Sequence, residues 1–254
     1  MKLIIGNWKM YPKSLKDAKI IFSSHKKMAK GMKRVKTVVC PPNVFIGALA
    51  GVKGKSAVIA IGAQDSFWES EGARTGETSP AMIASIGATH VIIGHSERRL
   101  LGETNKMVSQ KAALAVQSKL TVVLCVGEKS RNEAGEYFAE VREQLRASIA
   151  DIPKSMSKRL VVAYEPIWAI GAKASHPATP NDFHEMSILI RRQLVDHFGK
   201  VAGFKVPILY GGSVDERNAE GFLKQGGADG LLIGRISLDP QKFGAIIHLA
   251  EQVR

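Results

Sequence analysis

The sequence is poor in cysteine and has no long apolar segment. Its 254 residues include two cysteines, Cys40 and Cys125, and neither has a second Cys or a His at metal-ligand spacing. This scarcity excludes a disulfide scaffold, and we interpret both residues as buried, reduced thiols at strand ends. No apolar run reaches the ~18 residues that a transmembrane helix needs, and the first run is too short for a signal-peptide core. We therefore expect a cytoplasmic protein with no membrane partner and no bound metal.

Acidic residues are few relative to basic ones. There are 36 Lys and Arg against 23 Asp and Glu, which gives a net charge of +13. Much of the excess lies in segments 26–36 and 154–159, interpreted as outer helix faces and the turns after them. Two explanations are open: attraction of an anion (a phosphorylated metabolite or nucleic acid) and a solubility habit of the source organism. We favour the second and expect no nucleic-acid partner, because no aromatic residues interleave with these clusters.

The chain also lacks linkers and low-complexity segments, and short apolar runs recur along its whole length. These runs are nearly continuous in apolar residues, which is typical of strands buried on both faces of a parallel sheet. The eight runs are Leu3–Gly6, Thr37–Cys40, Val58–Ala63, His90–Gly94, Leu120–Val126, Leu160–Tyr164, Val206–Tyr210 and Gly230–Ile233.

Helical patterns separate the apolar runs. Ser79-Pro80, Thr179-Pro180 and Asp239-Pro240 each place a capping residue before a first-turn proline, which predicts a helix start. Segments Glu103–Ser118 and Asn132–Ala150 carry apolar residues at the three- and four-residue spacing of an amphipathic helix.

Eight strand-then-helix units of roughly 30 residues predict an α/β protein with a single (β/α)8 barrel, in one domain spanning residues 1–254. An open doubly wound sheet usually has fewer strands and a glycine-rich turn after the first one. Here the first run is followed by Asn7-Trp8-Lys9, which has no such turn. In (β/α)8 barrels the active site lies at the C-terminal ends of the strands, so the residues after each run become the candidates.

The segment Ala163–Gly171 is the most informative of these strand ends. It presents the Glu165 carboxylate at the tip of a strand, stiffens at Pro166 and continues as an apolar stretch ending in Gly171. A base beneath a lid suggests proton transfer in a closed, dry pocket. The alternative is a buried carboxylate that caps a structural loop.

Two further strand ends carry polar groups. Asn7 and Lys9 follow the first run, where the lysine would present a fixed positive charge to an anion or be an ordinary surface residue. His95 follows the fourth run at the start of a short helical turn, where the positive helix end favours a neutral imidazole that donates a hydrogen bond. The alternative is a histidine packed under a loop.

Small residues follow the seventh and eighth runs, at Gly211-Gly212-Ser213 and Gly234. Such residues let backbone N–H groups converge on an oxyanion, and the loops after strands 7 and 8 form the usual phosphate site of this fold.

Four of these segments together resemble the triosephosphate isomerase family, in that family's order and spacing. They are Asn7–Met10, Gly94–Arg99, Ala163–Gly171 and Tyr210–Val214. The segment from Gly62 to Met82 is similar to the family's intersubunit loop, and the resemblance extends from Leu3 to about Leu238.

The resemblance implies an isomerase, needing no cofactor, that interconverts dihydroxyacetone phosphate and D-glyceraldehyde 3-phosphate in glycolysis and gluconeogenesis. Glu165 would be the base that moves the proton. Neutral His95 would polarise the carbonyl, Lys9 would stabilise the negative charge and Asn7 would position the substrate. Glu97 would support Lys9 from behind.

Further residues take expected places through the same resemblance. Backbone N–H groups at Gly171, Ser213, Gly234 and Arg235 would hold the phosphate, and Cys125 would lie behind the catalytic groups. The protein would form a homodimer, in which Thr75 of one subunit packs near Lys9 and His95 of the other. The lid would consist of Pro166, Ile167, Trp168, Ala169, Ile170 and Gly171.

The sequence departs from the family pattern at three places. Segment 172–178 lacks the usual Thr-Gly-Lys hinge and is about two residues longer. We expect the lid still to close, but at a changed rate. Arg235 replaces a usual glycine, and we expect its guanidinium to point to solvent rather than to add charge at the rim. Segment 100–103 is one residue shorter and Asp65 replaces a common Asn, both near the expected dimer contacts.

Two rival functions remain at this point. A different phosphate-handling barrel enzyme would need only Gly211–Ser213 and Gly234, but it would not account for Asn7, Lys9 and His95 occurring with Glu165. The second rival is an inactive homologue or a basic barrel that binds nucleic acid. The intact catalytic residues argue against loss of activity, and the lack of interleaved aromatic and basic residues argues against nucleic acid.

Overall fold

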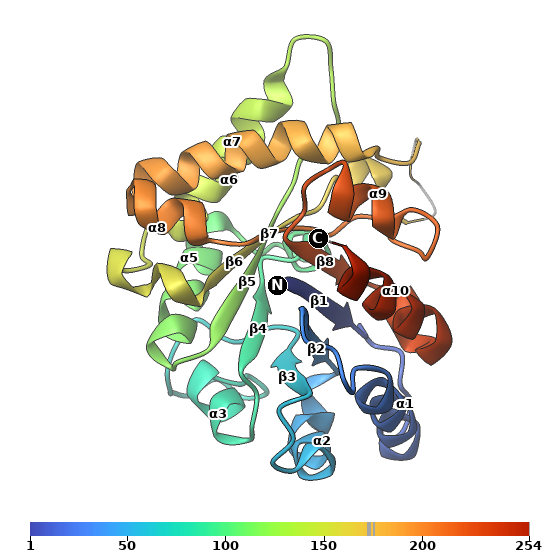
Figure 1. The fold of residues 1–254 in the computed structure, drawn as a ribbon. Helices are drawn as coiled ribbons and strands as arrows, with labels where there is room; N and C mark the ends of the chain where they lie inside the picture. The colour runs from blue at the N-terminus through green and yellow to red at the C-terminus, as the bar shows by residue number, and fades with distance from the viewer. Residues whose placement is uncertain (172–173, 175, 254) are drawn as a thin grey trace.

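A computed structural model describes residues 1–171, 174 and 176–253. Its strands form a closed, all-parallel barrel in sequence order, with helices packed around the outside (Figure 1), so the predicted (β/α)8 barrel is confirmed. Strand β1 pairs with β2 on one side and with β8 on the other, which closes the barrel. The strands are β1 (Lys2–Asn7), β2 (Val35–Cys40), β3 (Ile59–Ala63), β4 (His90–Ile93), β5 (Thr121–Val126), β6 (Leu160–Tyr164), β7 (Ile208–Tyr210) and β8 (Gly230–Ile233).

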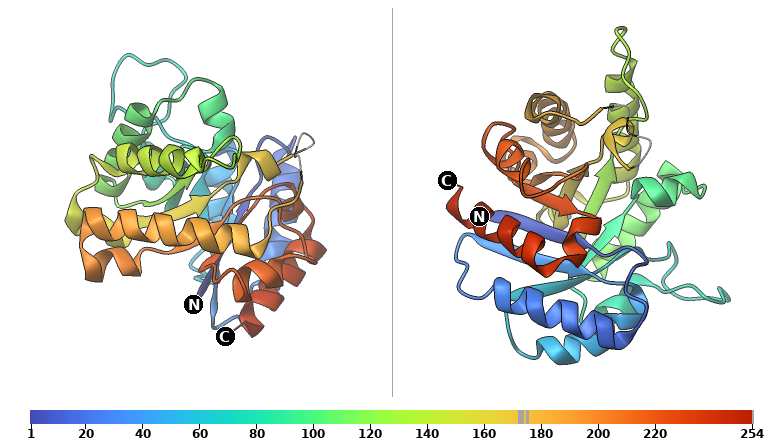
Figure 2. Two further views of the ribbon diagram at one scale, coloured as in Figure 1. Left: turned by 90° about the horizontal axis from the view of Figure 1, so that it is seen from above. Right: turned by 90° about the vertical axis from the view of Figure 1, so that its right-hand side faces the viewer.

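The helices form an outer layer that covers the barrel wall, as the two rotated views of Figure 2 show. The α-helices are α1 (Leu15–Met28), α2 (Ile46–Lys53), α3 (Pro80–Ser85), α4 (Ser96–Leu100), α5 (Asn105–Gln117), α6 (Glu136–Ile149), α7 (Pro180–Phe198), α8 (Lys200–Lys205), α9 (Ala219–Lys224) and α10 (Pro240–Gln252). Four 3-10 turns complete the described elements: η1 (Asn43–Phe45), η2 (Lys154–Arg159), η3 (Ile167–Ala169) and η4 (Arg235–Leu238).

The barrel has two apolar layers because alternate residues of each strand point to opposite faces. Side chains such as Ile5, Val38 and Cys125 fill the interior, whereas Ile4 and Val39 pack outward against the helices. Cys40 and Cys125 are both buried and unbridged, as predicted from their positions at the ends of apolar runs. The interior is therefore a packed core, and any binding cavity must lie at one end of the barrel.

The predicted helix starts are confirmed by their caps. The side chains of Ser79, Thr179 and Asp239 accept hydrogen bonds from backbone N–H groups in the first turns of α3, α7 and α10. In each case a proline follows the cap, where its fixed φ fits the helix and its missing N–H costs nothing.

Several predicted boundaries were wrong by a few residues. The helix expected at Glu103–Ser118 begins at Asn105, because the Thr104 side chain caps it by accepting from the Met107 N–H. The helix expected at Asn132–Ala150 begins at Glu136, whose N–H is held by the Asn132 side chain across a turn.

Strand ends shift for similar local reasons. Gly94 lies outside β4 because its φ of +72° turns the chain, and Val206 precedes β7 because Pro207 cannot donate to the sheet. Lys2 and Asn7 extend β1 at both ends.

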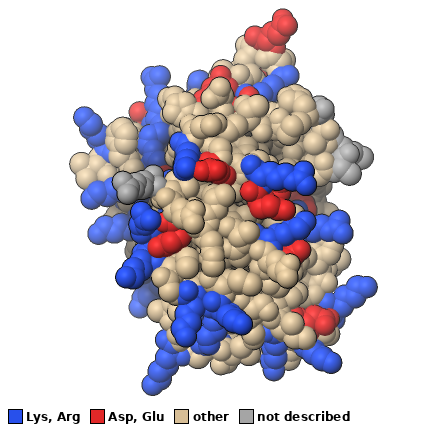
Figure 3. Space-filling view, turned by 45° about the vertical axis from the view of Figure 1, so that its right-hand side comes forward, with Lys and Arg blue, Asp and Glu red and all other residues tan. Residues whose placement is uncertain are grey.

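Three further features concern the altered hinge, membrane-spanning helices and the distribution of charge. Ala172, Lys173 and Ser175 of the altered hinge lie outside the described residues. No helix in the described part of the chain is long and apolar enough to cross a membrane. On the face shown in Figure 3, Lys and Arg side chains are scattered among acidic ones rather than joined in one stripe.

Candidate active site

A cavity of about 570 Å³ opens at the C-terminal ends of the strands. Its walls come from the segments after β1, β4, β6, β7 and β8, which the barrel brings to one end of the molecule. The residues expected from the sequence that line it are Asn7, Lys9, His95, Glu97, Glu165, Ile170, Gly171, Ser213, Gly234 and Arg235.

The first wall is the turn after β1. The Asn7 side chain is buried, and its Oδ1 accepts the backbone N–H of Lys9 at 3.0 Å. Lys9 has a φ of +52°, an uncommon conformation for a residue with a side chain, and such strain concentrates at functional sites. The Gln64 amide secures this turn by donating to the carbonyls of Lys9 and Cys40, both at 2.9 Å.

The Lys9 side chain extends along the cavity toward the segment after β4. Its Nζ lies 2.6 Å from Glu97 Oε1, and the lysine side chain is 25% exposed against 57% for the glutamate. A Cβ added at Gly234 would lie 3.4 Å from Lys9 Cε, so the segment after β8 packs against the lysine stem. The positive charge is thus fixed in place while its head still faces the cavity.

His95 is the N-cap residue of α4, and its hydrogen bonds define its tautomer. Nδ1 accepts the Glu97 backbone N–H at 3.2 Å, so in the neutral ring the proton is on Nε2. Nε2 lies 3.1 Å from Glu165 Oε1, and the residue is 8% exposed. The imidazole therefore presents an N–H donor to the cavity beside the carboxylate.

Glu165 stands directly after β6 and is 2% exposed. Its Oε2 accepts the Ser96 backbone N–H at 3.0 Å, and its Oε1 faces His95. Both carboxylate oxygens are thus held by residues of the β4 end, which orients the group toward the cavity without neutralising it through a full ion pair.

Two glycines make room for this carboxylate. A Cβ at Gly211 would lie 3.1 Å from Glu165 Cγ, and one at Gly127 would lie 1.8 Å from the Glu165 carbonyl oxygen. A side chain at either position would push the strand tip or the carboxylate aside. The requirement for glycine is therefore steric at both sites.

The expected lid begins after β6. Its first residue, Pro166, is buried, and η3 follows it. The Ala169 carbonyl accepts the Ser213 hydroxyl at 2.9 Å, and Ile170 and Gly171 line the cavity. Gly171 has a φ of +75°, which favours glycine at the far end of the segment.

A buried carboxylate that sequence reasoning missed anchors this segment. Oε1 of Glu128 accepts the Trp168 indole N–H at 2.8 Å, the Tyr164 hydroxyl at 2.6 Å and the Arg131 Nε–H at 3.0 Å. Burial and then the Glu128 charge raise the pKa of the Tyr164 hydroxyl, which stays a donor. Glu128 was detectable in principle, because it follows the β5 tip as Glu165 follows β6.

Cys125 lies in the barrel interior behind the cavity. Burial and then the nearby Glu165 carboxylate raise the pKa of its thiol well above the usual range. The thiol therefore stays protonated and serves as a small packing group rather than a nucleophile.

Arg235 stands at the mouth of the cavity. It begins η4, is exposed, and its guanidinium lies 5.7 Å from the centre of the Tyr11 ring, over its face. Both side chains line the cavity, so the guanidinium faces solvent at the rim. Whether the guanidinium points only to solvent, as expected from the sequence, or adds charge for a bound ligand stays a prediction.

Thr75 lies apart from this cavity in the described chain. It belongs to the extended segment between β3 and α3, which projects from the barrel (Figure 2), and it is exposed. Within the described residues no group of three or more His, Cys, Asp or Glu side chains is arranged to hold a metal ion.

Comparison with known proteins gives one consistent result. The sequence model of the family described as triosephosphate isomerase matches residues 2–250. The chain is 39% identical over 249 residues to the triosephosphate isomerase of Dictyoglomus turgidum, covering 97% of this chain and 98% of that protein. It is 40% identical to the enzymes of the same name from Trichlorobacter lovleyi (97% of each chain) and Idiomarina loihiensis (98% of each chain).

Matches of this extent and identity leave no large segment of either chain unaccounted for. With the closed barrel and the cavity at its C-terminal end, they place this chain in the triosephosphate isomerase family.

Proposed function

We propose that this protein is an isomerase that interconverts dihydroxyacetone phosphate and D-glyceraldehyde 3-phosphate, in glycolysis and gluconeogenesis. The observation that carries the proposal is the pairing of Glu165 with the Nε2 donor of His95 at 3.1 Å, beside the Lys9 ammonium. A buried base, a neutral donor and a fixed positive charge are the groups that proton transfer next to a carbonyl requires.

In the proposed reaction Glu165 removes a proton from the carbon next to the substrate carbonyl. The substrate carbonyl oxygen accepts a hydrogen bond from His95 Nε2–H, which lies 3.1 Å from Glu165 Oε1 in this structure, and this polarises the carbonyl as the enediolate forms. His95 then moves the hydroxyl proton from the neighbouring oxygen to this one, so that the former hydroxyl becomes the new carbonyl. Glu165 returns its proton to the neighbouring carbon. No electrons leave the substrate, so the residues suffice without a cofactor.

Lys9 would stabilise the negative charge that develops on the enediolate oxygens. Its ion pair with Glu97 at 2.6 Å keeps the ammonium at the cavity floor, and Asn7 fixes the turn that carries it. A preorganised donor of this kind is typically worth ~10²–10³ in rate.

The phosphate would bind at the small-residue turns after β6, β7 and β8. Backbone N–H groups of Gly171, Ser213, Gly234 and Arg235 are the proposed donors, and all four residues line the cavity. Pro166–Gly171 would act as the lid that excludes water, because an exposed enediolate can expel its phosphate.

We further propose that residues 1–254 form one folding unit and that the protein is a cytoplasmic homodimer. Since β1 pairs with β8, both ends of the chain are needed to close the barrel. Large apolar side chains are exposed near the projecting segment, including Met82 at 52% and Leu101 at 79%. A partner subunit covering them would bring its Thr75 toward the site.

Turnover of D-glyceraldehyde 3-phosphate, with product reduction by glycerol 3-phosphate dehydrogenase followed as NADH oxidation, tests the proposal. Fast turnover is expected. A folded protein without turnover would favour an inactive homologue, and turnover of another phosphorylated substrate alone would favour a different barrel enzyme.

A further inference from the structure

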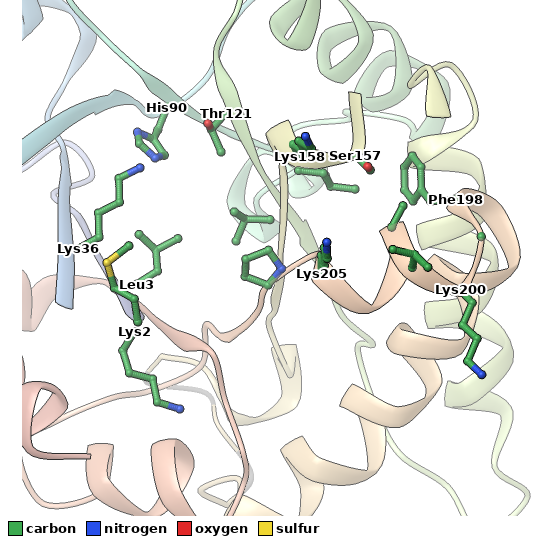
Figure 4. A pocket seen from close by; sticks show the side chains of 17 residues that line it. Lys2, Leu3, Lys36, His90, Thr121, Ser157, Lys158, Phe198, Lys200 and Lys205 are labelled. Carbon is green, nitrogen blue, oxygen red and sulfur yellow. The ribbon is translucent and has the colours of Figure 1, made fainter. Parts of the chain in front are cut away.

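A second cavity lies at the opposite end of the barrel from the active site. Its volume is about 730 Å³, larger than the 570 Å³ of the active-site cavity and within the usual ~300–1,000 Å³ of ligand pockets. It is lined by residues at the starts of five strands, β1, β2, β4, β5 and β6, together with η2 and α8 (Figure 4). We call it the basal pocket.

The basal pocket is separate from the active site. The catalytic candidates follow the ends of the strands, whereas the basal lining residues stand at their starts. The strands that line the basal pocket have four to six residues, and at about 3.3 Å per residue they place the two cavities roughly 13–20 Å apart, with the packed barrel interior between them.

The charge of the basal pocket has one sign. Among the described residues, the lining contains five lysines and no Asp or Glu; they are Lys2, Lys36, Lys158, Lys200 and Lys205. Lys36, Lys158 and Lys205 are exposed and lie around the cavity in Figure 4, whereas the side chains of Lys2 and Lys200 run away from it. Lys2 is already satisfied, because its Nζ donates to the Ala228 carbonyl at 2.7 Å.

Lys36, Lys158 and Lys205 have no acidic partner within 4 Å among the described residues. Although Lys36 is exposed, partial desolvation at the pocket lowers the pKa of its ammonium group. Like charges facing one cavity repel one another, and an anion between them would relieve that repulsion.

His90 adds a buried, neutral hydrogen-bonding group. It is 2% exposed, and its Nδ1 shares a hydrogen bond of 2.7 Å with Thr89 Oγ1. Burial and then Lys36 lower the pKa of His90 to about 3, so the ring is neutral. The ring turns toward Lys36 in Figure 4.

The rest of the lining is apolar. The pocket also has an apolar wall, formed by Leu3, Leu160, Val161, Phe198 and Pro207. This wall makes the pocket different from a basic patch on an open surface. Such walls suit the carbon skeleton of a ligand rather than a fully hydrated inorganic ion.

We propose that the basal pocket binds a small organic phosphate, one with an apolar or aromatic body and at least two negative charges, at a site distinct from the isomerase centre. Lys36, Lys158 and Lys205 contact the phosphate groups. His90 forms a hydrogen bond with a ligand hydroxyl, and the apolar wall covers the carbon skeleton.

The test uses the trinitrophenyl derivative of ATP as probe, an aromatic polyanion whose fluorescence rises in an apolar environment. Full-length protein is titrated at constant ionic strength. Saturable binding to the wild type is expected, and the double variant Lys36→Gln/Lys205→Gln should weaken it at least about tenfold, because charged hydrogen bonds are lost.

Two further variants separate the pocket from the general basic surface. Lys16→Gln/Lys19→Gln removes the same charge from exposed positions on α1 and should leave probe affinity within about twofold. Val201→Glu places a negative charge on a 73% exposed pocket residue and should abolish binding. Isomerase turnover unchanged in the pocket variants shows that they fold.

Three results would overturn the proposal. The wild type would show no saturable binding, both lysine double variants would lose affinity equally, or excess dihydroxyacetone phosphate would displace the probe. The last result would place the probe in the isomerase cavity.

Discussion

Substitution of Gly211 by alanine should displace Glu165, the proposed base. A Cβ at this position would lie 3.1 Å from Glu165 Cγ and 3.4 Å from the Tyr164 carbonyl oxygen. Because the strand tip is fixed in the barrel, the carboxylate is the part that yields, by a few tenths of an ångström. A misplacement of about 1 Å costs ~10² in rate, so we expect Gly211→Ala to lower kcat about 3–10-fold.

The effect should appear mainly in kcat, because the added Cβ meets Glu165, whereas the proposed phosphate donor of this turn, Ser213, stands two residues further along the chain. Steady-state kinetics in both directions measure this split, and thermal unfolding measures the overpacking cost of about 1–3 kcal/mol. Gly51→Ala is the matched control, since its Cβ meets nothing within 4 Å on the outer helix α2. An unchanged kcat in folded Gly211→Ala would refute the claim that the position of Glu165 limits the rate.

Three further substitutions test other parts of the account. Glu165→Asp should lower kcat by about 10² or more with little change in KM, since the base retracts by roughly one bond; steady-state kinetics decide. Arg235→Gly should leave kcat near wild type, and a large rise in KM would mean that the guanidinium contacts the phosphate. His25→Phe should reduce the fall in the free energy of unfolding between pH 7 and pH 4, measured by urea unfolding. The reason is that both ring nitrogens of His25 are buried without a hydrogen-bond partner among the described residues.

The sign of the His25 effect follows from its burial, which lowers the pKa from 6.5 to about 4. The unfolded chain binds the proton more readily, so stability is fully present above pH 6.5 and falls as the pH drops toward 4. The loss is at most about 1.4 kcal/mol per pH unit. A profile as steep in His25→Phe as in the wild type would assign the acid sensitivity to other groups, His90 among them.

The fold was predictable because local and global signals agree. The apolar runs are too continuous for strands buried on one face only, and they suffice to predict eight strands. A proline directly after a capping residue predicts the starts of α3, α7 and α10. Exact boundaries were not predictable, because single side chains decide them. Thr104 and Asn132 each shift a helix start by capping or bridging the first turn.

The candidate site residues that stand directly after a strand were predictable from the sequence. Asn7, His95 and Glu165 line one cavity because parallel strands end at the same face of the barrel. Supporting residues were missed when their role depends on three-dimensional packing. Gln64 holds the Lys9 turn from a distant segment, and Gly127 is needed only because the Glu165 backbone passes within contact.

The basal pocket shows the same limit. Its lysines come from separate strands and helices, so along the chain they resemble ordinary solvated charges. Only closure of the barrel places Lys36 and Lys205 around one cavity, where their charges can act on one ligand.

The most direct test of the central claim is turnover of D-glyceraldehyde 3-phosphate by the wild type and by Glu165→Ala, compared under one coupled assay. The account predicts fast turnover in the wild type and a loss of several orders of magnitude in the variant, with unchanged thermal unfolding. Comparable turnover in both proteins would remove Glu165 from its role as base and contradict the mechanism.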